Sequence, residues 1–132
     1  MNRDKIIEWV FRIVPAVIML QTLFFKFTGH PASVALFTEL GVEPFGRVGL
    51  GVVELIAAIL LLIPETVKYG IVLGLGLMAG AIATHLFIIG IIFNNDGGAL
   101  FTLAAVAMVC LLVLAYRHWS SIQGLIPGLK AA

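Results

Sequence analysis

The stretch Gly46–Ile63, GRVGLGVVELIAAILLLI, predicts the fold, because it combines eighteen mostly apolar residues with a single carboxylate, Glu54. At a helical rise of ~1.5 Å per residue it covers roughly 27 Å, close to the hydrocarbon thickness of a bilayer. Pro64 follows, where a proline commonly ends a helix. A carboxylate inside such a span costs ~2.5 kcal/mol or more unless it is neutral, paired or directed into a polar pocket. Glu54 therefore requires a polar partner elsewhere in the chain.

The composition indicates a membrane protein. Of the 132 residues, 61% are hydrophobic and only 11% are charged, whereas soluble domains carry about 25% charged residues. The length predicts one domain over residues 1–132. The net charge of +1, without a basic run, gives no indication of a nucleic-acid partner. Cys110 is the single cysteine, which excludes an intramolecular disulfide and a CxxC redox centre.

Three further spans accompany Gly46–Ile63, at Ile13–Phe27, Tyr69–Phe93 and Leu100–Tyr116. Residues 1–12 predict an amphipathic helical lead at the membrane surface. The segment Pro31–Leu40 starts with proline and is followed by Gly41, which predicts a short helix at the outer interface. The expected fold is an all-α integral membrane protein, a four-transmembrane-helix bundle with a short interfacial helix between spans one and two.

The distribution of cations predicts the orientation of this bundle. With four spans, the two termini and the turn after span two share one side of the membrane. That side carries Arg3, Lys5, Arg12, Lys68, Arg117 and Lys130, and the other side carries Lys26 and Arg47. The positive-inside rule therefore places both termini in the cytoplasm.

Polar side chains recur at one depth in three of the spans. Gln21, Glu54 and His85 each lie seven or eight residues from the outer end of their predicted span, which is ~10–12 Å at the helical rise. Other polar residues lie above them, nearer the outer surface. The expected ligand-binding pocket is lined by Gln21, Lys26, Arg47, Glu54, His85 and Asp96.

Structural roles are the alternative for these residues. Lys26 and Arg47 are long enough to reach lipid headgroups, Gln21 and His85 suit hydrogen bonds between or within helices, and Asp96 suits a turn. A Glu54–Lys26 or Glu54–Arg47 pair is also compatible with a purely structural role. A carboxylate within a membrane span is nevertheless a functional hypothesis by default. A lone histidine in a span is a poor metal site, and we expect none here.

Glycines in the third span predict a close helix contact. Gly76 and Gly80 form a GxxxG pattern, extended by Thr84. Such small residues let two helix backbones approach each other. We therefore expect Gly76 and Gly80 to face another helix, either within the bundle or across a homo-oligomer.

The same residues carry a resemblance to a known family. The runs LFFKFTGHP, LGVEPFGRVGLGVVELIAAILLLIP, LGLGLMAGAIATHL and NNDGGALFTLA resemble the DoxX-like family of small four-span bacterial membrane proteins, over about residues 12 to 116. The resemblance implies a four-helix bundle in the bacterial cytoplasmic membrane. The family name derives from a thiosulfate:quinone oxidoreductase subunit, and other members are described as membrane partners of redox or detoxification enzymes.

The sequence is compatible with three functions, of which one is part of an enzyme system. The first is the membrane subunit of a quinone-linked oxidoreductase system, in which Lys26, Arg47 or His85 donates to a quinone carbonyl and Glu54 relays protons. It needs a bound quinone and a redox-enzyme partner, since no metal, haem or flavin motif is present. The second is a non-enzymatic accessory or assembly protein whose buried polar network is structural. The third is a small transporter or proton path.

Overall fold

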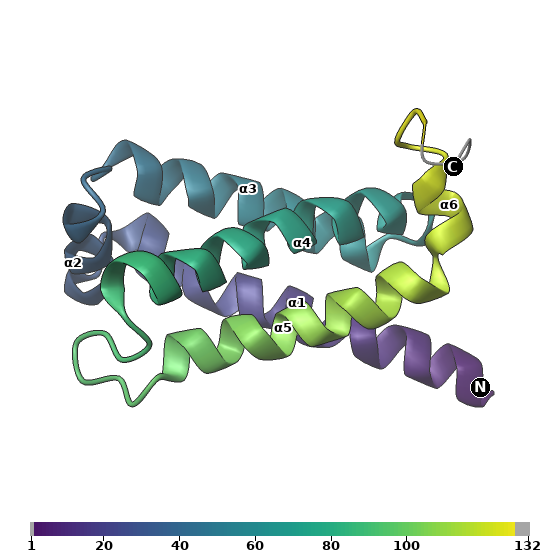
Figure 1. Ribbon diagram of the computed structural model, residues 1–132, viewed down its shortest axis with the longest axis horizontal. Helices are drawn as coiled ribbons and strands as arrows, with labels where there is room; N and C mark the ends of the chain where they lie inside the picture. Colours follow the sequence, from purple (N-terminus) through teal and green to yellow (C-terminus); the bar gives the residue numbers. More distant parts are fainter. Residues whose placement is uncertain (1, 129–132) are drawn as a thin grey trace.

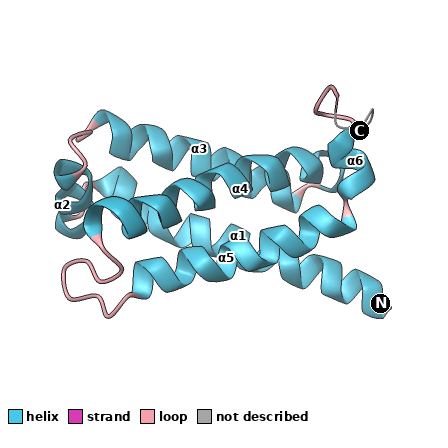
Figure 2. Cartoon of the chain, in the orientation of Figure 1, coloured by secondary structure: helices cyan, strands magenta, loops and turns pink. Residues whose placement is uncertain are grey.

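The computed structural model describes residues 2–128, and the described residues form helices, turns and loops without a strand (Figure 2). Lys130, one of the cations used to predict the orientation, lies outside this range. The helices are α1 (Arg3–Thr28), α2 (Pro31–Glu39), α3 (Phe45–Leu62), the 3₁₀ turn η1 (Pro64–Thr66), α4 (Val67–Thr84), the π-helical turn η2 (His85–Ile89), α5 (Ala99–Arg117) and α6 (Trp119–Gln123).

The four long helices form an antiparallel bundle in which α1 packs on α3 and α5, and α4 packs on α3 and α5 (Figure 1). The N-terminus, η1 and α6 lie at one end, and α2 lies across the other end, against α1 and α3. We call these the terminal end and the α2 end. The short connection at η1 makes α3 and α4 antiparallel neighbours, as expected for helix pairs with short loops.

Most of the predicted elements are confirmed. Four helical segments among the described residues are long and apolar enough to cross a membrane, and the helix expected over Pro31–Leu40 is present as α2. The expected amphipathic lead is not a separate element, because α1 runs unbroken from Arg3 to Thr28. Pro15 lies within α1 and does not end it.

The expected end of the third span at Phe93 is wrong. The helical backbone of α4 continues only through η2 to Ile89. Gly90 follows with a φ of 84°, a conformation that glycine adopts at little cost and that ends the helix. The apolar run around Gly90 gave no sign of this break, since Gly76 and Gly80 lie inside the same helix without breaking it.

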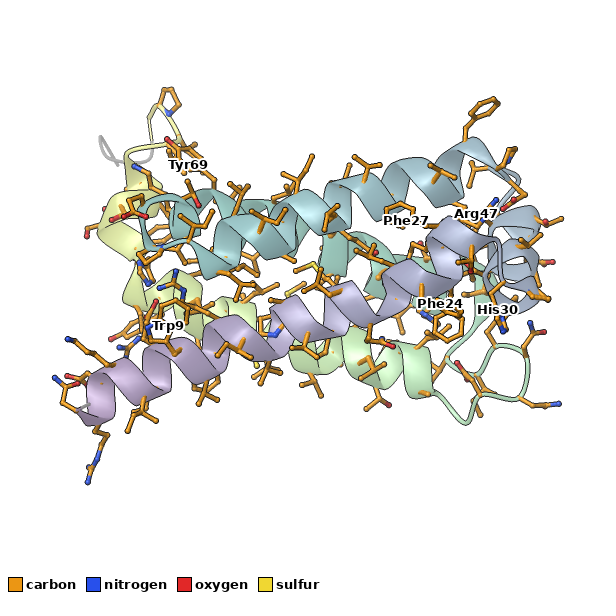
Figure 3. All side chains as sticks on the ribbon, turned by 180° about the vertical axis from the view of Figure 1, so that it is seen from behind. Trp9, Phe24, Phe27, His30, Arg47 and Tyr69 are labelled. Atoms are coloured by element: carbon orange, nitrogen blue, oxygen red, sulfur yellow. The ribbon has the colours of Figure 1, made fainter. Side chains whose placement is uncertain are left out.

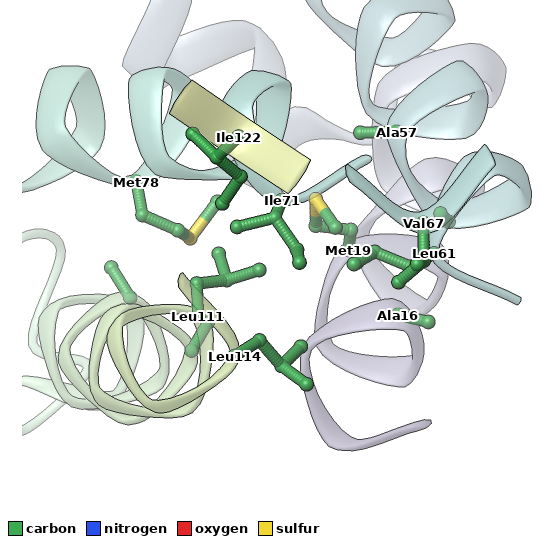
Figure 4. Close-up of a cluster of buried hydrophobic side chains, with 13 residues drawn as sticks. Ala16, Met19, Ala57, Leu61, Val67, Ile71, Met78, Leu111, Leu114 and Ile122 are labelled. Atoms are coloured by element: carbon green, nitrogen blue, oxygen red, sulfur yellow. The ribbon is translucent and has the colours of Figure 1, made fainter. Parts of the chain in front are cut away.

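Apolar side chains fill the core of the bundle and also cover the outward faces of its long helices. A buried cluster lies between the long helices and extends toward the terminal end; it includes Met19, Leu61, Ile71, Leu111 and Ile122 (Figure 4). The outward faces of the long helices are also apolar, with large exposed side chains such as Val17, Phe24, Val52, Val109 and Leu112. Such a surface is typical of helices in contact with lipid rather than water.

The predicted close contact at Gly76 and Gly80 is wrong within the bundle. A Cβ atom added at either glycine would meet no atom of the described residues within 4 Å. The close approach lies six residues before Gly76, where a Cβ on Gly70 would come within 2.6 Å of the backbone N of Leu61. Gly70 therefore marks the close contact of α4 with α3 near η1, whereas a Cβ on Gly74 would meet the side chain of Leu111 on α5.

Candidate functional site

A cavity of about 340 Å³ lies in the half of the bundle toward the α2 end. We call it the inner cavity. All four long helices, together with α2 and η2, contribute to its wall, and most of its lining side chains are apolar. Its polar lining residues are Thr22, Lys26, Glu54, Thr84 and His85. The size and the mostly apolar lining with a few polar groups are typical of a site for a small organic ligand.

The Glu54 carboxylate is paired inside this cavity. Its Oε2 atom lies 3.1 Å from Lys26 Nζ and 3.2 Å from the hydroxyl oxygen of Thr22. Lys26 Nζ also donates to that hydroxyl at 2.9 Å. Glu54 is 7% exposed and Lys26 is 9% exposed. The Lys26 ammonium thus compensates the charge of Glu54. Glu54–Lys26 is one of the two ion pairs considered from the sequence.

Helix direction explains why these two side chains meet. In an α-helix the Cα–Cβ bonds tilt toward the N-terminus. Lys26 lies near the C-terminus of α1, so its side chain tilts down into the bundle. Glu54 lies in the middle of α3, which begins at the α2 end, so its side chain tilts up toward Lys26. The long lysine stem covers the remaining distance along the apolar wall.

The same rule directs Arg47 away from the cavity. Arg47 is near the N-terminus of α3, so its side chain tilts toward the α2 end, and Figure 3 shows it at the same end of the bundle as His30. Its guanidinium pairs with the Glu43 carboxylate at 2.9 Å and donates to the backbone carbonyl oxygen of Lys26. Arg47 therefore caps the C-terminal end of α1 and does not line either cavity described here.

His85 lines the inner cavity from η2, but not at the depth of Glu54. It lies four residues from the end of η2 at Ile89, whereas Glu54 lies nine residues from Phe45 at the start of α3. The equal depth expected from the sequence is therefore wrong, because span three ends earlier than predicted. Among the described residues, the hydrogen-bond partner of His85 Nδ1 is the Gly90 carbonyl oxygen, at 3.0 Å, and not Glu54.

The contact with Gly90 also defines the chemistry of the imidazole. A carbonyl oxygen only accepts hydrogen bonds, so Nδ1 must carry the proton. In the neutral ring Nε2 is then an acceptor, able to receive a hydrogen bond from a hydroxyl group. In the wall of the inner cavity, Lys26 thus offers a donor and His85 an acceptor.

Gln21 and Asp96 line a second cavity of about 330 Å³ between α1, α2, α5 and the loop before α5. We call it the outer cavity. Thr22, Lys26, Leu36, Phe37, Leu100 and Leu103 line both cavities, so the two are neighbours. The six residues expected to share one pocket thus divide: Lys26, Glu54 and His85 line the inner cavity, while Gln21 and Asp96 line the outer one with Lys26.

Asp96 organises the loop that closes the outer cavity. Burial alone would raise the pKa of its carboxyl, but backbone hydrogen bonds outweigh this and hold the pKa below its usual range. The N–H groups donate at 3.2, 2.8 and 3.3 Å, from Phe93, Gly98 and Leu100. The turn-forming role considered for Asp96 therefore accounts for its contacts.

Sequence reasoning missed two contributions to the cavities. Thr22 lies four residues before Lys26 on the same face of α1 and joins both members of the ion pair. The spacing of four residues from Lys26 is the sequence signal that could have identified Thr22. Leu36 and Phe37 from α2 line both the inner and the outer cavity, which makes α2 part of the site rather than an isolated interfacial helix.

A second polar cluster at the terminal end was also missed. Arg12 is buried and donates from Nε to the Leu61 carbonyl oxygen at 2.7 Å. Glu8 pairs with Arg117 at 3.1 Å and His118 at 2.7 Å, and lies 3.6 Å from Arg12. These contacts join α1 to the C-terminal ends of α3 and α5. They account for Arg12 as a structural residue, although the sequence indicated only a cytoplasmic cation.

The geometry defines a class of protein: a four-helix bundle with an apolar exterior and an ion pair in the wall of an internal, mostly apolar cavity. Comparisons of the chain with protein-family models, with curated proteins and with solved structures find no match.

Proposed function

We propose that the protein is an integral membrane protein whose four long helices span a bacterial cytoplasmic membrane, with both termini in the cytoplasm. The lengths of the helices and their apolar outward faces support this proposal. Of the described cations, Arg3, Lys5, Arg12, Lys68 and Arg117 lie at or near the terminal end, whereas Lys26 and Arg47 lie near the α2 end. The positive-inside rule then orients the terminal end inward.

Labelling of a cysteine in the loop before α5 tests the orientation. In a Cys110→Ala background, Asn95→Cys in intact cells should react with a membrane-impermeant maleimide added outside, because Asn95 is exposed in the loop at the α2 end. A cysteine at Ser120, near the terminal end, should react only after the cells are opened. The reverse pattern would contradict the orientation.

We further propose that the inner cavity binds a quinone, and that the protein serves as the quinone-holding membrane subunit of an oxidoreductase system. The single observation that carries this is the Lys26–Glu54 pair in the wall of an otherwise apolar cavity. A quinone head is a flat apolar ring with carbonyl oxygens at opposite sides. The Lys26 ammonium suits one carbonyl as a donor, and His85 Nε2 suits the hydroxyl of the reduced form as an acceptor.

The resemblance to the DoxX-like family supports the choice of a quinone over other amphipathic ligands. The chain has no electron carrier of its own among the motifs considered, so the proposal includes a redox-enzyme partner that supplies electrons. Reduction of a quinone takes two electrons and two protons, one proton on each carbonyl oxygen. Glu54 and Lys26 would exchange protons at one of these oxygens, and a carboxylate and an ammonium within hydrogen-bond reach are suited to this role.

Binding of decylubiquinone to the purified protein in detergent tests the proposal. We expect saturable binding, and we expect Lys26→Met to weaken it by roughly tenfold to a hundredfold, the usual value of a hydrogen bond from a charged group. Glu54→Gln keeps the shape of the side chain but removes the charge that holds Lys26. We expect this variant to bind decylubiquinone more weakly as well. Isothermal titration calorimetry measures both.

Two exposed residues provide matched controls. Lys5→Met and Glu65→Gln make the same chemical changes at exposed positions near the terminal end, and should bind like the wild type. No saturable binding by a well-folded wild type would contradict the quinone proposal. That result, together with a Lys26→Met/Glu54→Met variant that is as stable as the wild type or more so, would favour the accessory protein with a structural polar network.

A further inference from the structure

The exposed residues in the wall of the inner cavity all lie on two helices. Most of its lining side chains are buried or partly buried, and the exposed ones are Leu50 on α3 and Gly76 and Gly80 on α4. The cavity therefore reaches the surface of the bundle between α3 and α4. We call this place the lateral opening.

The packing of α3 and α4 explains why an opening lies there. Near η1 the two helices are in close contact, since Gly70 faces the backbone of Leu61. Toward the α2 end they separate, as Figure 1 shows for the two ribbons. Gly76 and Gly80 carry no side chain into the resulting space, and a Cβ at either position would meet no atom of the described part of the chain within 4 Å. Two glycines one turn apart thus leave the entrance unfilled.

The depth of the opening places it in hydrocarbon when the helices span a membrane. Leu50 lies five residues after the start of α3, and Gly76 lies thirteen residues before the end of η2. At ~1.5 Å per residue these positions are roughly 8 and 19 Å below the α2 end. A hydrocarbon core of ~30 Å covers this range.

The outer cavity has a different entrance. Its exposed lining residues are Gln21, Phe25, Ala32, Asn94 and Ala99, which include polar side chains and lie near the loop at the α2 end. Among residues 2–128, by contrast, the exposed lining residues at the lateral opening are a leucine and two glycines. The contrast in polarity indicates that the inner cavity exchanges its ligand with an apolar phase.

We infer that the ligand of the inner cavity enters sideways from the bilayer, between α3 and α4 past Gly76 and Gly80. This inference rests on the proposed membrane insertion and quinone site. It specifies the ligand as a molecule dissolved in the hydrocarbon, whose ring or chain passes the glycines before its polar head reaches Lys26 and Glu54. Gly76 and Gly80 are then entrance residues rather than the helix contact that their pattern predicted.

Photolabelling from the lipid phase tests the opening without using a quinone. The protein is placed in nanodiscs containing a phosphatidylcholine with a diazirine in the middle of one acyl chain, and labelled residues are mapped by mass spectrometry. We expect label on Glu54 inside the cavity and on Phe87, which is 83% exposed on the outer face of η2. Gly76→Phe and Gly80→Phe should each remove the label from Glu54 and leave Phe87 labelled.

The matched control is Gly49→Phe. Gly49 is an exposed glycine of α3 that also has nothing within 4 Å of an added Cβ, but it does not line the inner cavity. It should keep the label on Glu54. Absence of label from Glu54 in the wild type, as a homo-oligomer covering Gly76 and Gly80 would cause, overturns the lateral opening. So does label that persists in both Phe variants.

Competition between the lipid probe and decylubiquinone distinguishes this inference from the quinone proposal. Excess decylubiquinone added before photolysis should protect Glu54 from the lipid probe in the wild type. If Glu54 is labelled through the opening but decylubiquinone gives no protection, the lateral opening stands and the quinone proposal fails. If Glu54 is not labelled while calorimetry shows quinone binding, the quinone site stands and the lateral opening fails.

Discussion

Replacing Lys26 with methionine is expected to lower the free energy of unfolding by about 3–5 kcal/mol, because it leaves the buried Glu54 carboxylate without its partner cation. The two charged groups lie 3.1 Å apart in the wall of the inner cavity. The Thr22 hydroxyl remains as a hydrogen-bond donor to Glu54, but a neutral donor does not compensate a buried charge. Unfolding in mixed micelles with increasing dodecyl sulfate measures the loss.

The double variant Lys26→Met/Glu54→Met distinguishes pairing from packing. Replacing both members of a buried pair by apolar residues is often neutral or stabilising, by about 1–4 kcal/mol. We therefore expect the double variant to recover most of the loss, which a double-mutant cycle reports as a coupling energy. Lys5→Met, at an exposed position, should change stability by no more than about 0.5 kcal/mol. A Lys26→Met variant as stable as Lys5→Met would show that the pair does not hold the bundle.

Alanine at Gly70 is expected to destabilise the protein relative to alanine at Gly76, by about 1–3 kcal/mol. Both changes replace a glycine inside α4, so both gain the same helix propensity, roughly 1 kcal/mol. They differ in what the new methyl group meets: at Gly70 the backbone of Leu61 at 2.6 Å, and at Gly76 no atom within 4 Å. The backbone of α3 cannot yield as the end of a flexible side chain can, so α3 and α4 must move apart.

The same unfolding assay measures this difference directly. Gly80→Ala serves as a second reference, since its added Cβ also meets nothing within 4 Å. Equal stabilities of the Gly70 and Gly76 variants would contradict the assignment of the close helix contact to Gly70. They would also contradict the explanation that α3 and α4 are in close contact at Gly70 and separate from there toward the α2 end.

The secondary structure was largely predictable because the relevant signals are local. Long apolar runs, Pro31 at the start of α2 and Pro64 after α3 defined the helices to within a few residues. The end of the third span was not predictable from such signals. Gly90 takes a left-handed φ of 84° and breaks the helix, whereas Gly76 and Gly80 stay helical, and the apolar neighbours of these glycines do not distinguish the two behaviours.

The ion pair of the candidate site was predictable from the sequence, whereas the positions of the residues around it were not. The cost of an unpaired carboxylate required a partner for Glu54, and Lys26 was one of the two cations considered. Choosing between Lys26 and Arg47 needed the direction of each helix as well as the depth, because Cα–Cβ bonds tilt toward the helix N-terminus. The expected depth of His85 depended on where span three ends, and the error there carried over to the depth it was expected to share with Gln21 and Glu54.

The glycine patterns illustrate the same dependence on helix rotation. Gly70–Gly74 and Gly76–Gly80 are equally good GxxxG patterns, but they face different neighbours. Spacing along a helix does not by itself say which face meets a second helix and which meets a cavity. The contacts of α4 with α3 near η1 determine which face of α4 meets a second helix. These contacts depend on the packing of all four long helices.

The most direct test of the central claim is a density map of the protein in nanodiscs with decylubiquinone. We expect density for a quinone head in the inner cavity, with one carbonyl oxygen within hydrogen-bond distance of Lys26 Nζ and the tail directed between α3 and α4 past Gly76. An inner cavity that stays free of quinone density at a saturating concentration, or a quinone bound elsewhere on the bundle, would contradict it.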